Sequence, residues 1–292
     1  MTMPAMDRPA DWGPADLIDL DRYPILDPDS PRGAALIAEI RARMAETVLC
    51  ALPGFLKPEV MPRLVAEAEA LVPLAYRGPA EASPYFYNYG TGLDALPAGH
   101  PRRRKSPRRL SQIASDLVPE GALIRRLYEW PPLATFLARA LNVPALYRCA
   151  DRFQGLNISV MEEGGCQQWH FDTNESNITL LMQAAEQGGE FEYVPLIRSA
   201  EDENYDAVRR VLDGDSNRVV RLAQEPGMLV LFRGHHSIHR VAPCRGKRRR
   251  LQSILAFNTH PGVMGSHESN LLHYGPRVAL FPREPAARQA AD

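Results

Sequence analysis

The second half of the chain is divided into short segments that alternate apolar and polar residues, and this pattern constrains the fold most strongly. Successive side chains of an extended strand point to opposite faces, so each segment predicts a strand with one buried face. Regular spacing between turn residues is typical of β-sandwiches and barrels. The eight segments are residues 155–161, 168–172, 178–183, 189–194, 218–222, 227–232, 238–242 and 248–258. A double-stranded β-helix, or jelly roll, has this number of strands, and we predict that fold.

The first half of the chain is predicted to be mainly helical. Apolar residues recur at helical spacing in residues 31–48, 57–71 and 119–143. Residues 76–107 show no sustained period, which predicts a long loop. The expected organisation is an irregular arm at residues 1–30, then one domain at 31–292, with helical support at 31–145, a jelly-roll core at 147–260 and an irregular C-terminal wrap at 261–292.

Composition narrows the class of protein. The chain has 292 residues, of which 45% are hydrophobic, enough for a full core. Its formal net charge of -1 provides no general attraction to nucleic acid or to anionic membranes. The four cysteines lack CxxC spacing, and there is neither a leader-like N-terminus nor an apolar stretch of the roughly 20 residues that cross a bilayer. We expect a cytoplasmic protein that binds a small molecule, with a homodimer as an open alternative.

Two histidine-containing segments predict a metal site. In the segment Trp-His-Phe-Asp at 169–172, His170 and Asp172 would point to the same side of a strand and take adjacent positions on one ion. His239, in the strand-like run 238–242, would be the third ligand. Two imidazoles and one carboxylate leave the opposite face of the metal open, which is the ligand set of non-haem Fe(II) oxygenases. The alternative is that both histidines only bond to backbone groups.

Several nearby histidines and arginines are alternatives for the third metal ligand and for an anchor of the co-substrate. His239 is preferred among the histidines because the others fall in a turn or beyond the last strand; these are His235, His236 and His260. Arg248 and Arg250 share the polar face of the strand that follows. Because a guanidinium binds a carboxylate through two parallel hydrogen bonds and stays charged when buried, either could anchor a dicarboxylate. We predict Arg250 as the anchor, with Arg248 as the second candidate.

A basic run at residues 101–109 raises nucleic-acid binding as an alternative. No aromatic stacking platform or groove-reading motif accompanies this run, so nucleic-acid binding is not expected. Binding of a small anionic group of a substrate is the preferred functional use of these residues.

Several segments carry a resemblance to a known family. They are residues 169–172 (WHFD), 188–195 (GGEFEYVP), 231–234 (LFRG) and 239–243 (HRVAP), with further similarity at 52–56 and 100–103. With them the chain resembles the Fe(II)/2-oxoglutarate-dependent oxygenases, especially the branch of free-amino-acid hydroxylases and radical halogenases of bacterial secondary metabolism. The resemblance implies Fe(II), 2-oxoglutarate and O2 as cofactors. It also implies that decarboxylation of 2-oxoglutarate to succinate is coupled to hydroxylation of an unactivated C–H bond.

The resemblance gives Asp172 a particular meaning. In the halogenases of this branch a small residue replaces the carboxylate ligand and makes room for chloride. The carboxylate of Asp172 therefore implies a hydroxylase. The alternatives are desaturation or cyclisation with the same cofactors, or a metal-binding jelly roll without redox turnover, either a sensor or a hydrolytic site that uses zinc.

The resemblance also suggests substrate contacts. In amino-acid-specific members, the residue three before the first histidine ligand and the residue just after the motif help to hold the amino acid. Here these are Gln167 and Thr173, both neutral. Further candidates are Arg102 and Arg103 for a zwitterion, Tyr274 for a lid over the mouth, and Asn157 as a donor to 2-oxoglutarate or substrate. We expect the substrate to be a free amino acid or a related small polar metabolite.

Overall fold

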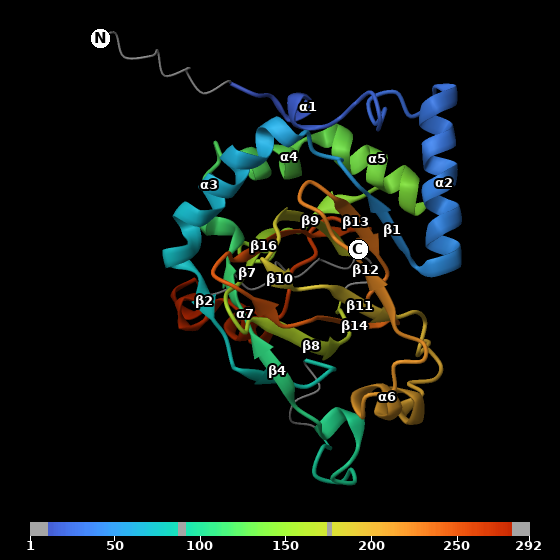
Figure 1. Cartoon of the computed structure of the whole chain (residues 1–292), viewed down its shortest axis with the longest axis vertical. Coiled ribbons are helices and arrows are strands. Elements are labelled where there is room, and N and C mark those ends of the chain that lie inside the picture. The colour runs from blue at the N-terminus through green and yellow to red at the C-terminus, as the bar shows by residue number, and fades with distance from the viewer. Residues whose placement is uncertain (1–10, 87–91, 174–176, 282–292) are drawn as a thin grey trace, which may run out of the picture.

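The computed structural model describes residues 11–86, 92–173 and 177–281. Two antiparallel sheets lie face to face in the middle of the molecule, and helices cover the outer side of the larger sheet (Figure 1). This arrangement confirms the predicted jelly-roll fold class. Residues 1–10 of the expected arm and 282–292 of the expected C-terminal wrap lie outside the described residues.

The larger sheet separates the helices from a central cavity. Its seven strands are, in spatial order, β1 (Leu49–Leu52), β13 (Leu229–Phe232), β9 (Asn177–Gln183), β16 (Arg250–Leu255), β7 (Leu156–Met161), β5 (Ser111–Ile113) and β2 (Tyr76–Arg77). In β7, Leu156, Ile158 and Val160 belong to the main hydrophobic core with the helices. The alternate residues, such as Ser159, line the cavity. Strand alternation therefore gives this sheet one apolar face and one mostly polar face.

The helical layer packs on the apolar face. It comprises α1 (Pro14–Leu17), α2 (Pro31–Thr47), α3 (Met61–Leu71), α4 (Leu123–Glu129) and α5 (Pro131–Leu141), with 3-10 turns at Pro58–Val60, Val72–Leu74 and Ser115–Leu117. Ser30 caps α2, its side chain accepting a hydrogen bond from the amide of Gly33 at 3.1 Å. The helices predicted at 31–48 and 57–71 are confirmed. The single helix predicted at 119–143 is wrong: Trp130 is extended, as the residue before a proline prefers, and α5 begins at Pro131.

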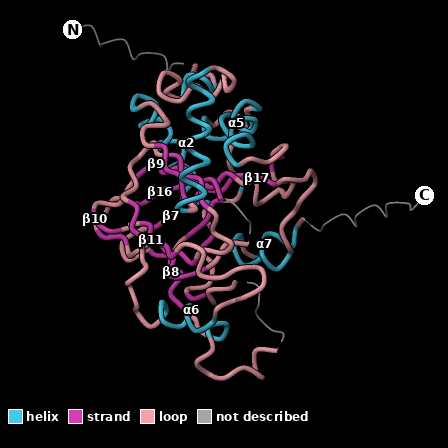
Figure 2. Tube along the Cα trace, turned by 90° about the vertical axis from the view of Figure 1, so that its right-hand side faces the viewer, coloured by secondary structure: helices cyan, strands magenta, loops and turns pink. Residues whose placement is uncertain are grey.

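The smaller sheet carries a helix of its own on its outer side. Its six strands are, in order, β12 (Val220–Leu222), β11 (Phe191–Val194), β14 (Ile238–Val241), β8 (Cys166–His170), β4 (Ser106–Arg109) and β3 (Glu81–Ala82). Two small sheets pair β10 (Gln187–Gly188) with β15 (Cys244–Arg245), and β17 (Phe257–Asn258) with β6 (Tyr147–Arg148). Helix α6 (Tyr205–Leu212) packs Val208 and Val211 against Trp169 and Phe171 of the smaller sheet region. Figure 2 shows α2 and α5 at one end of the molecule and α6 at the other.

Two regions predicted to be irregular contain helices and strands within their described residues. The predicted loop at 76–107 contains β2, β3, a 3-10 turn at Pro101–Arg103 and the start of β4, each strand pairing with a partner in one of the sheets. The predicted irregular wrap contains α7 (His267–Tyr274), capped by Ser266, and a 3-10 turn at Pro276–Leu280. Strands of two to four residues and a helix of eight are too short to show a period. For the same reason β1 and α6 were not predicted.

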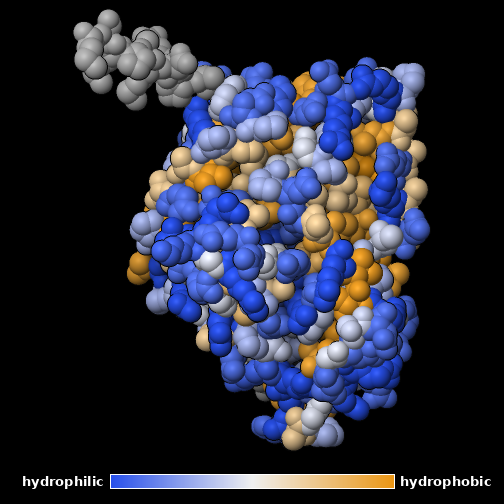
Figure 3. Space-filling model, in the orientation of Figure 1, coloured by the Kyte–Doolittle hydropathy of each residue, from blue (hydrophilic) through white to orange (hydrophobic). Residues whose placement is uncertain are grey.

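The described part of the chain contains no helix both long and apolar enough to cross a membrane. Figure 3 shows a mainly hydrophilic face, with hydrophobic residues gathered toward its right-hand side.

Candidate metal centre and co-substrate pocket

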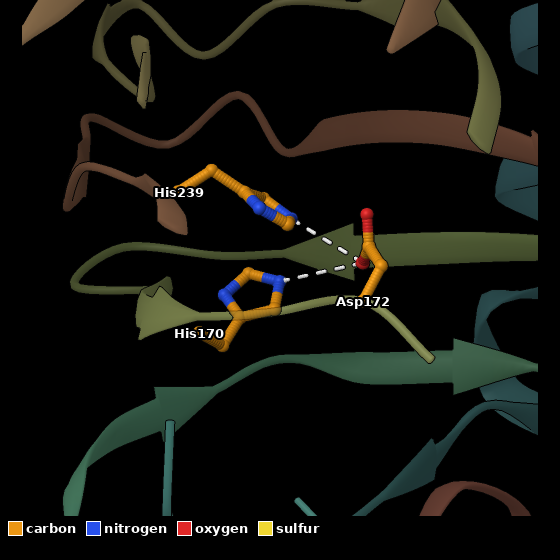
Figure 4. Close-up of side chains that lie close together, drawn as sticks. All are labelled: His170, Asp172 and His239. Carbon is orange, nitrogen blue, oxygen red and sulfur yellow. Dashed lines mark ion pairs between the residues drawn. The ribbon is translucent and has the colours of Figure 1, made fainter. Parts of the chain in front are cut away.

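Three predicted ligands meet at the open end of the smaller sheet. His170 is the last residue of β8, and His239 lies directly opposite it on β14. Asp172 follows β8 by two residues and points between the two rings (Figure 4). Its Oδ1 lies 3.3 Å from Nε2 of His239 and 4.0 Å from Nε2 of His170. In the described residues, these three form the one group of histidine, cysteine and acidic side chains whose ligand atoms lie close enough to hold a metal, all within 4.8 Å.

Backbone hydrogen bonds orient both imidazoles. Nδ1 of His170 donates to the carbonyl oxygen of Gln168 at 2.8 Å, and Nδ1 of His239 donates to that of Ser237 at 2.9 Å. A carbonyl oxygen only accepts, so each Nδ1 carries the proton and each Nε2 keeps its lone pair. Such bonds to the outer nitrogen are the usual support of a metal-bound histidine.

The protonation states also suit a metal. Burial, together with the neighbouring His239, lowers the pKa of His170 to about 3, so its ring is neutral at physiological pH. Burial alone would raise the pKa of Asp172, but His239 and His170 outweigh it and hold the pKa below its ordinary value. The second oxygen, Oδ2, is buried without a hydrogen-bond partner in the described part of the chain. A buried carboxylate of this kind is costly unless a cation meets it, so these residues fit Fe(II).

The turn beside Asp172 is shaped around its carboxylate. The amide of Asp172 donates to the carbonyl oxygen of Gly234 at 3.1 Å. Arg198 holds the same turn, donating through Nε and Nη2 to the carbonyl oxygen of His235 at 2.9 and 2.6 Å. The Arg198 guanidinium also lies 3.9 Å from the ring centroid of Phe171, the residue between His170 and Asp172 in the sequence. Arg198 therefore ties the two segments that place Asp172.

A cavity of about 180 Å³ extends from the triad between the two sheets. Arg250 lines it from β16 and is only 2% exposed. Its Nε donates to the carbonyl oxygen of Gly189 at 3.2 Å, and its Nη2 donates to Oε1 of Gln224. Burial lowers the pKa of Arg250 to about 10, which leaves the guanidinium charged at neutral pH. A buried cation facing a cavity beside a metal site suits a carboxylate of the co-substrate.

Arg248, the second candidate, lies elsewhere. Its Nε donates to the carbonyl oxygen of Ala184 at 2.9 Å and its Nη2 to that of Ala185 at 3.1 Å. It is not among the residues that line the cavity. The two arginines differ because β16 begins only at Arg250, so Arg248 belongs to the preceding turn.

The predicted substrate residues divide into two groups. Four line the cavity, namely Asn157, Gln167, Thr173 and Tyr274. The side-chain amide nitrogen of Gln167 lies 2.9 Å from Nε2 of His170, and the hydroxyl of Tyr274 donates to Oδ1 of Asn157 at 2.5 Å. Arg102 and Arg103 do not line it. They lie in the 3-10 turn, where Arg103 donates to the carbonyl oxygen of Leu96 at 2.7 Å.

Other cavity residues were not predicted. They include Gln112, Ser159 and Gln252. Alternation could have found two of them, since Ser159 shares a strand face with Asn157 and Gln252 shares one with Arg250. Gln112 comes from a region without a readable period, so no sequence signal connected it with the site.

The basic run at 101–109 is not one continuous basic surface. Arg104 pairs with Asp213, whereas Arg108 is 2% exposed and donates to Oε1 of Gln112 at 2.8 Å. The run thus contributes to ion pairing at the surface and to the wall behind the cavity.

Solved structures of other proteins share this fold. The chain is similar to AviO1 from Streptomyces viridochromogenes Tue57 (16% identity, 78% of this chain, 97% of the other, TM-score 0.53). It is also similar to SnoN, described as a non-haem alpha-ketoglutarate-dependent epimerase of nogalamycin biosynthesis (13% identity, 77% and 83% coverage, TM-score 0.52). No curated protein sequence matches. At these identities the likeness concerns the fold.

The three-residue centre on this fold is the ligand set of non-haem Fe(II) oxygenases, in agreement with the resemblance found in the sequence. The family model of Halogenase D matches residues 100–269, more than half of the chain and all three triad residues. The chain belongs to this family.

Proposed function

We propose that this protein hydroxylates an unactivated C–H bond of a small polar metabolite, with a free amino acid or a derivative as the preferred class. The observation that carries the proposal is the carboxylate of Asp172, which completes the facial triad with His170 and His239. Bound Fe(II), with 2-oxoglutarate and O2, would supply the oxidising chemistry. The protein would hold the iron through these three residues and a carboxylate of 2-oxoglutarate through Arg250.

The family match favours one rival outcome, halogenation. Halide would need a coordination position, and the Asp172 carboxylate occupies the place where a small residue would leave one. Hydroxylation is therefore the outcome that this ligand set supports.

The cavity supports a small-molecule substrate. Its volume of about 180 Å³ must hold 2-oxoglutarate and the reacting part of the substrate, and its walls are fixed by strands of both sheets. Gln167 and Thr173 flank the metal ligands, so they would contact a substrate placed next to the iron. Asn157 and Tyr274 would close the wall that faces α7.

The test begins without O2. Adding Fe(II) and 2-oxoglutarate anaerobically should produce the visible metal-to-ligand charge-transfer band, and O2 should then give succinate, stimulated by the correct amino acid or metabolite. Product mass spectrometry should show addition of one oxygen atom. Asp172→Ala combined with His239→Ala should abolish the band, whereas His236→Ala, a nearby histidine outside the triad, should retain it. Absence of the band in the unaltered protein would refute the proposal.

A further inference from the structure

A row of uncharged polar side chains crosses the cavity face of the larger sheet. Ser159 on β7 is paired in register with Gln112 on β5 and with Gln252 on β16. Directly paired residues have Cβ atoms about 5 Å apart, so the three side chains form one continuous strip. All three are less than 9% exposed and line the cavity that contains the triad.

The row has hydrogen-bonding capacity that the protein leaves unused. The hydroxyl oxygen of Ser159 is buried and has no partner in the described part of the chain. Gln252 beside it is 7% exposed and lines the same cavity. Buried polar groups without partners are rare because each loses its bonds to water. The Ser159 hydroxyl, facing a cavity between the amides of Gln112 and Gln252, indicates a polar group supplied by a ligand.

The cavity surface around the row carries little charge, although Arg108 lies behind the row and donates to Oε1 of Gln112 at 2.8 Å. Outside the triad, Arg250 is the one charged residue among the described residues that line the cavity, and Asp172 is their one carboxylate. The remaining polar lining consists largely of amides, including Gln154, Asn157 and Gln224. An ammonium entering this region would lose its hydration without meeting a carboxylate, and an entering carboxylate would meet the Gln112 amide rather than Arg108, which does not line the cavity. Either loss of hydration is far more costly than burying an amide that finds partners.

The row lies beside the predicted co-substrate anchor. Gln252 follows Arg250 by two residues on the same strand face, a displacement of about 7 Å. Arg250 is paired with Met161 at one end of this face, and Ile254 with Asn157 at the other. The row thus lies between the predicted position of the co-substrate carboxylate and the part of the wall formed by Asn157.

We propose that Gln112, Ser159 and Gln252 bind the far end of the substrate, and that this end is an uncharged hydrogen-bonding group, a carboxamide or a hydroxyl. The inference rests on the proposed hydroxylase function and adds the substrate's chemistry to it. A free amino acid that fits would carry a neutral polar side chain, such as that of glutamine, asparagine or homoserine.

Amino acids of similar size test whether the far end of the substrate must be uncharged. L-Glutamine, L-asparagine and L-homoserine would be compared with L-glutamate and L-ornithine, using the perturbation of the anaerobic Fe(II)–2-oxoglutarate band and the rate of succinate formation. The best uncharged member should bind and react at least tenfold better than either charged one. Preference for glutamate or ornithine, or no response to any uncharged member, would overturn this inference. Neither result would affect the hydroxylase proposal, which fails if the band is absent or if the product gains no oxygen atom.

Substitutions test whether the residues of the row cause this substrate preference. Ser159→Ala should lower kcat/KM for the best uncharged substrate about tenfold and leave the KM for 2-oxoglutarate unchanged. Ser111→Ala is the matched control, because Ser111 lies beside Gln112 on β5, on the opposite face of the strand. Gln252→Glu should shift preference toward ornithine. If Ser159→Ala instead raised only the KM for 2-oxoglutarate, the row would belong to the co-substrate and the inference would be wrong.

Discussion

A Cβ atom on residue 234 would lie 1.7 Å from Oδ2 of Asp172, so the glycine at this position makes room for the ligand carboxylate. The two residues come from segments 62 positions apart and meet through the Asp172 amide bond to the Gly234 carbonyl. The reason for a glycine here is close approach of the carboxylate, since the backbone of Gly234 does not adopt a positive φ.

We predict that Gly234→Ala displaces the Asp172 carboxylate and weakens metal binding. Loss of supporting contacts around a metal ligand typically costs 10- to 100-fold in affinity, and we expect a decrease in that range for Fe(II), or for Co(II) as a spectroscopic substitute. Calorimetric titration would measure it. Gly121→Ala is the matched control, because nothing lies within 4 Å of a Cβ at that loop position. In an Asp172→Gly background the Gly234→Ala change should cost little further stability, and full additivity would contradict the coupling.

Removing the Asp172 carboxylate should change the coordination of the metal. With glycine at both 172 and 234, the space beside the two histidines would be open to an anion. We expect Asp172→Gly, loaded with Fe(II) and 2-oxoglutarate, to show a charge-transfer band that shifts with chloride, and to divert product toward chlorination. The same variant in halide-free sulfate buffer provides the control. Hydroxylation at the unaltered rate, indifferent to chloride, would show that Asp172 is not a ligand.

The two arginine candidates should behave differently on substitution. Arg250 is buried in the cavity wall, whereas Arg248 bonds to backbone carbonyl oxygens outside it. Loss of a charged hydrogen-bonded partner costs about 1.5–3 kcal/mol, so Arg250→Gln should raise the KM for 2-oxoglutarate roughly 10- to 100-fold. Arg248→Gln should change it less than twofold. Initial rates over a range of 2-oxoglutarate concentrations decide the matter, and the reverse ranking would transfer the anchoring role to Arg248.

The sequence was informative where the residues of the site lie in segments whose alternation of apolar and polar residues also predicts a strand. Alternation placed His170 and Asp172 on one side of a strand, and the number of strands predicted the jelly roll. It could not reveal contacts made through short or distant segments. Nothing local marks Gly234 as the partner of Asp172, because their meeting depends on the pairing of β14 with β8. Likewise Gln112 reaches the cavity from β5, which is too short to carry a readable pattern.

His273 should make the folded protein sensitive to acid. It is half-buried on α7, where it lines the cavity beside Phe86. Loss of hydration there, together with Arg108, lowers its pKa to about 3, against 6.5 for an ordinary histidine. Between these values the unfolded chain binds a proton that the folded chain does not. Stability contributed at this position is therefore fully present above about pH 6.5 and declines as the pH falls toward 3, by at most about 1.4 kcal/mol per pH unit.

Replacing the ring by a group that does not titrate should remove this dependence. We expect His273→Gln to flatten the plot of unfolding free energy against pH between 4 and 6.5, compared with the unaltered protein under the same metal-free conditions. Urea denaturation at several pH values would measure the difference in slope, which isolates His273 because His170 contributes equally to both proteins. His267→Gln, at the exposed first turn of the same helix, is the matched control and should leave the slope unchanged. Parallel pH profiles for His273→Gln and the unaltered protein would show that the ring is protonated, or exposed, in the folded state.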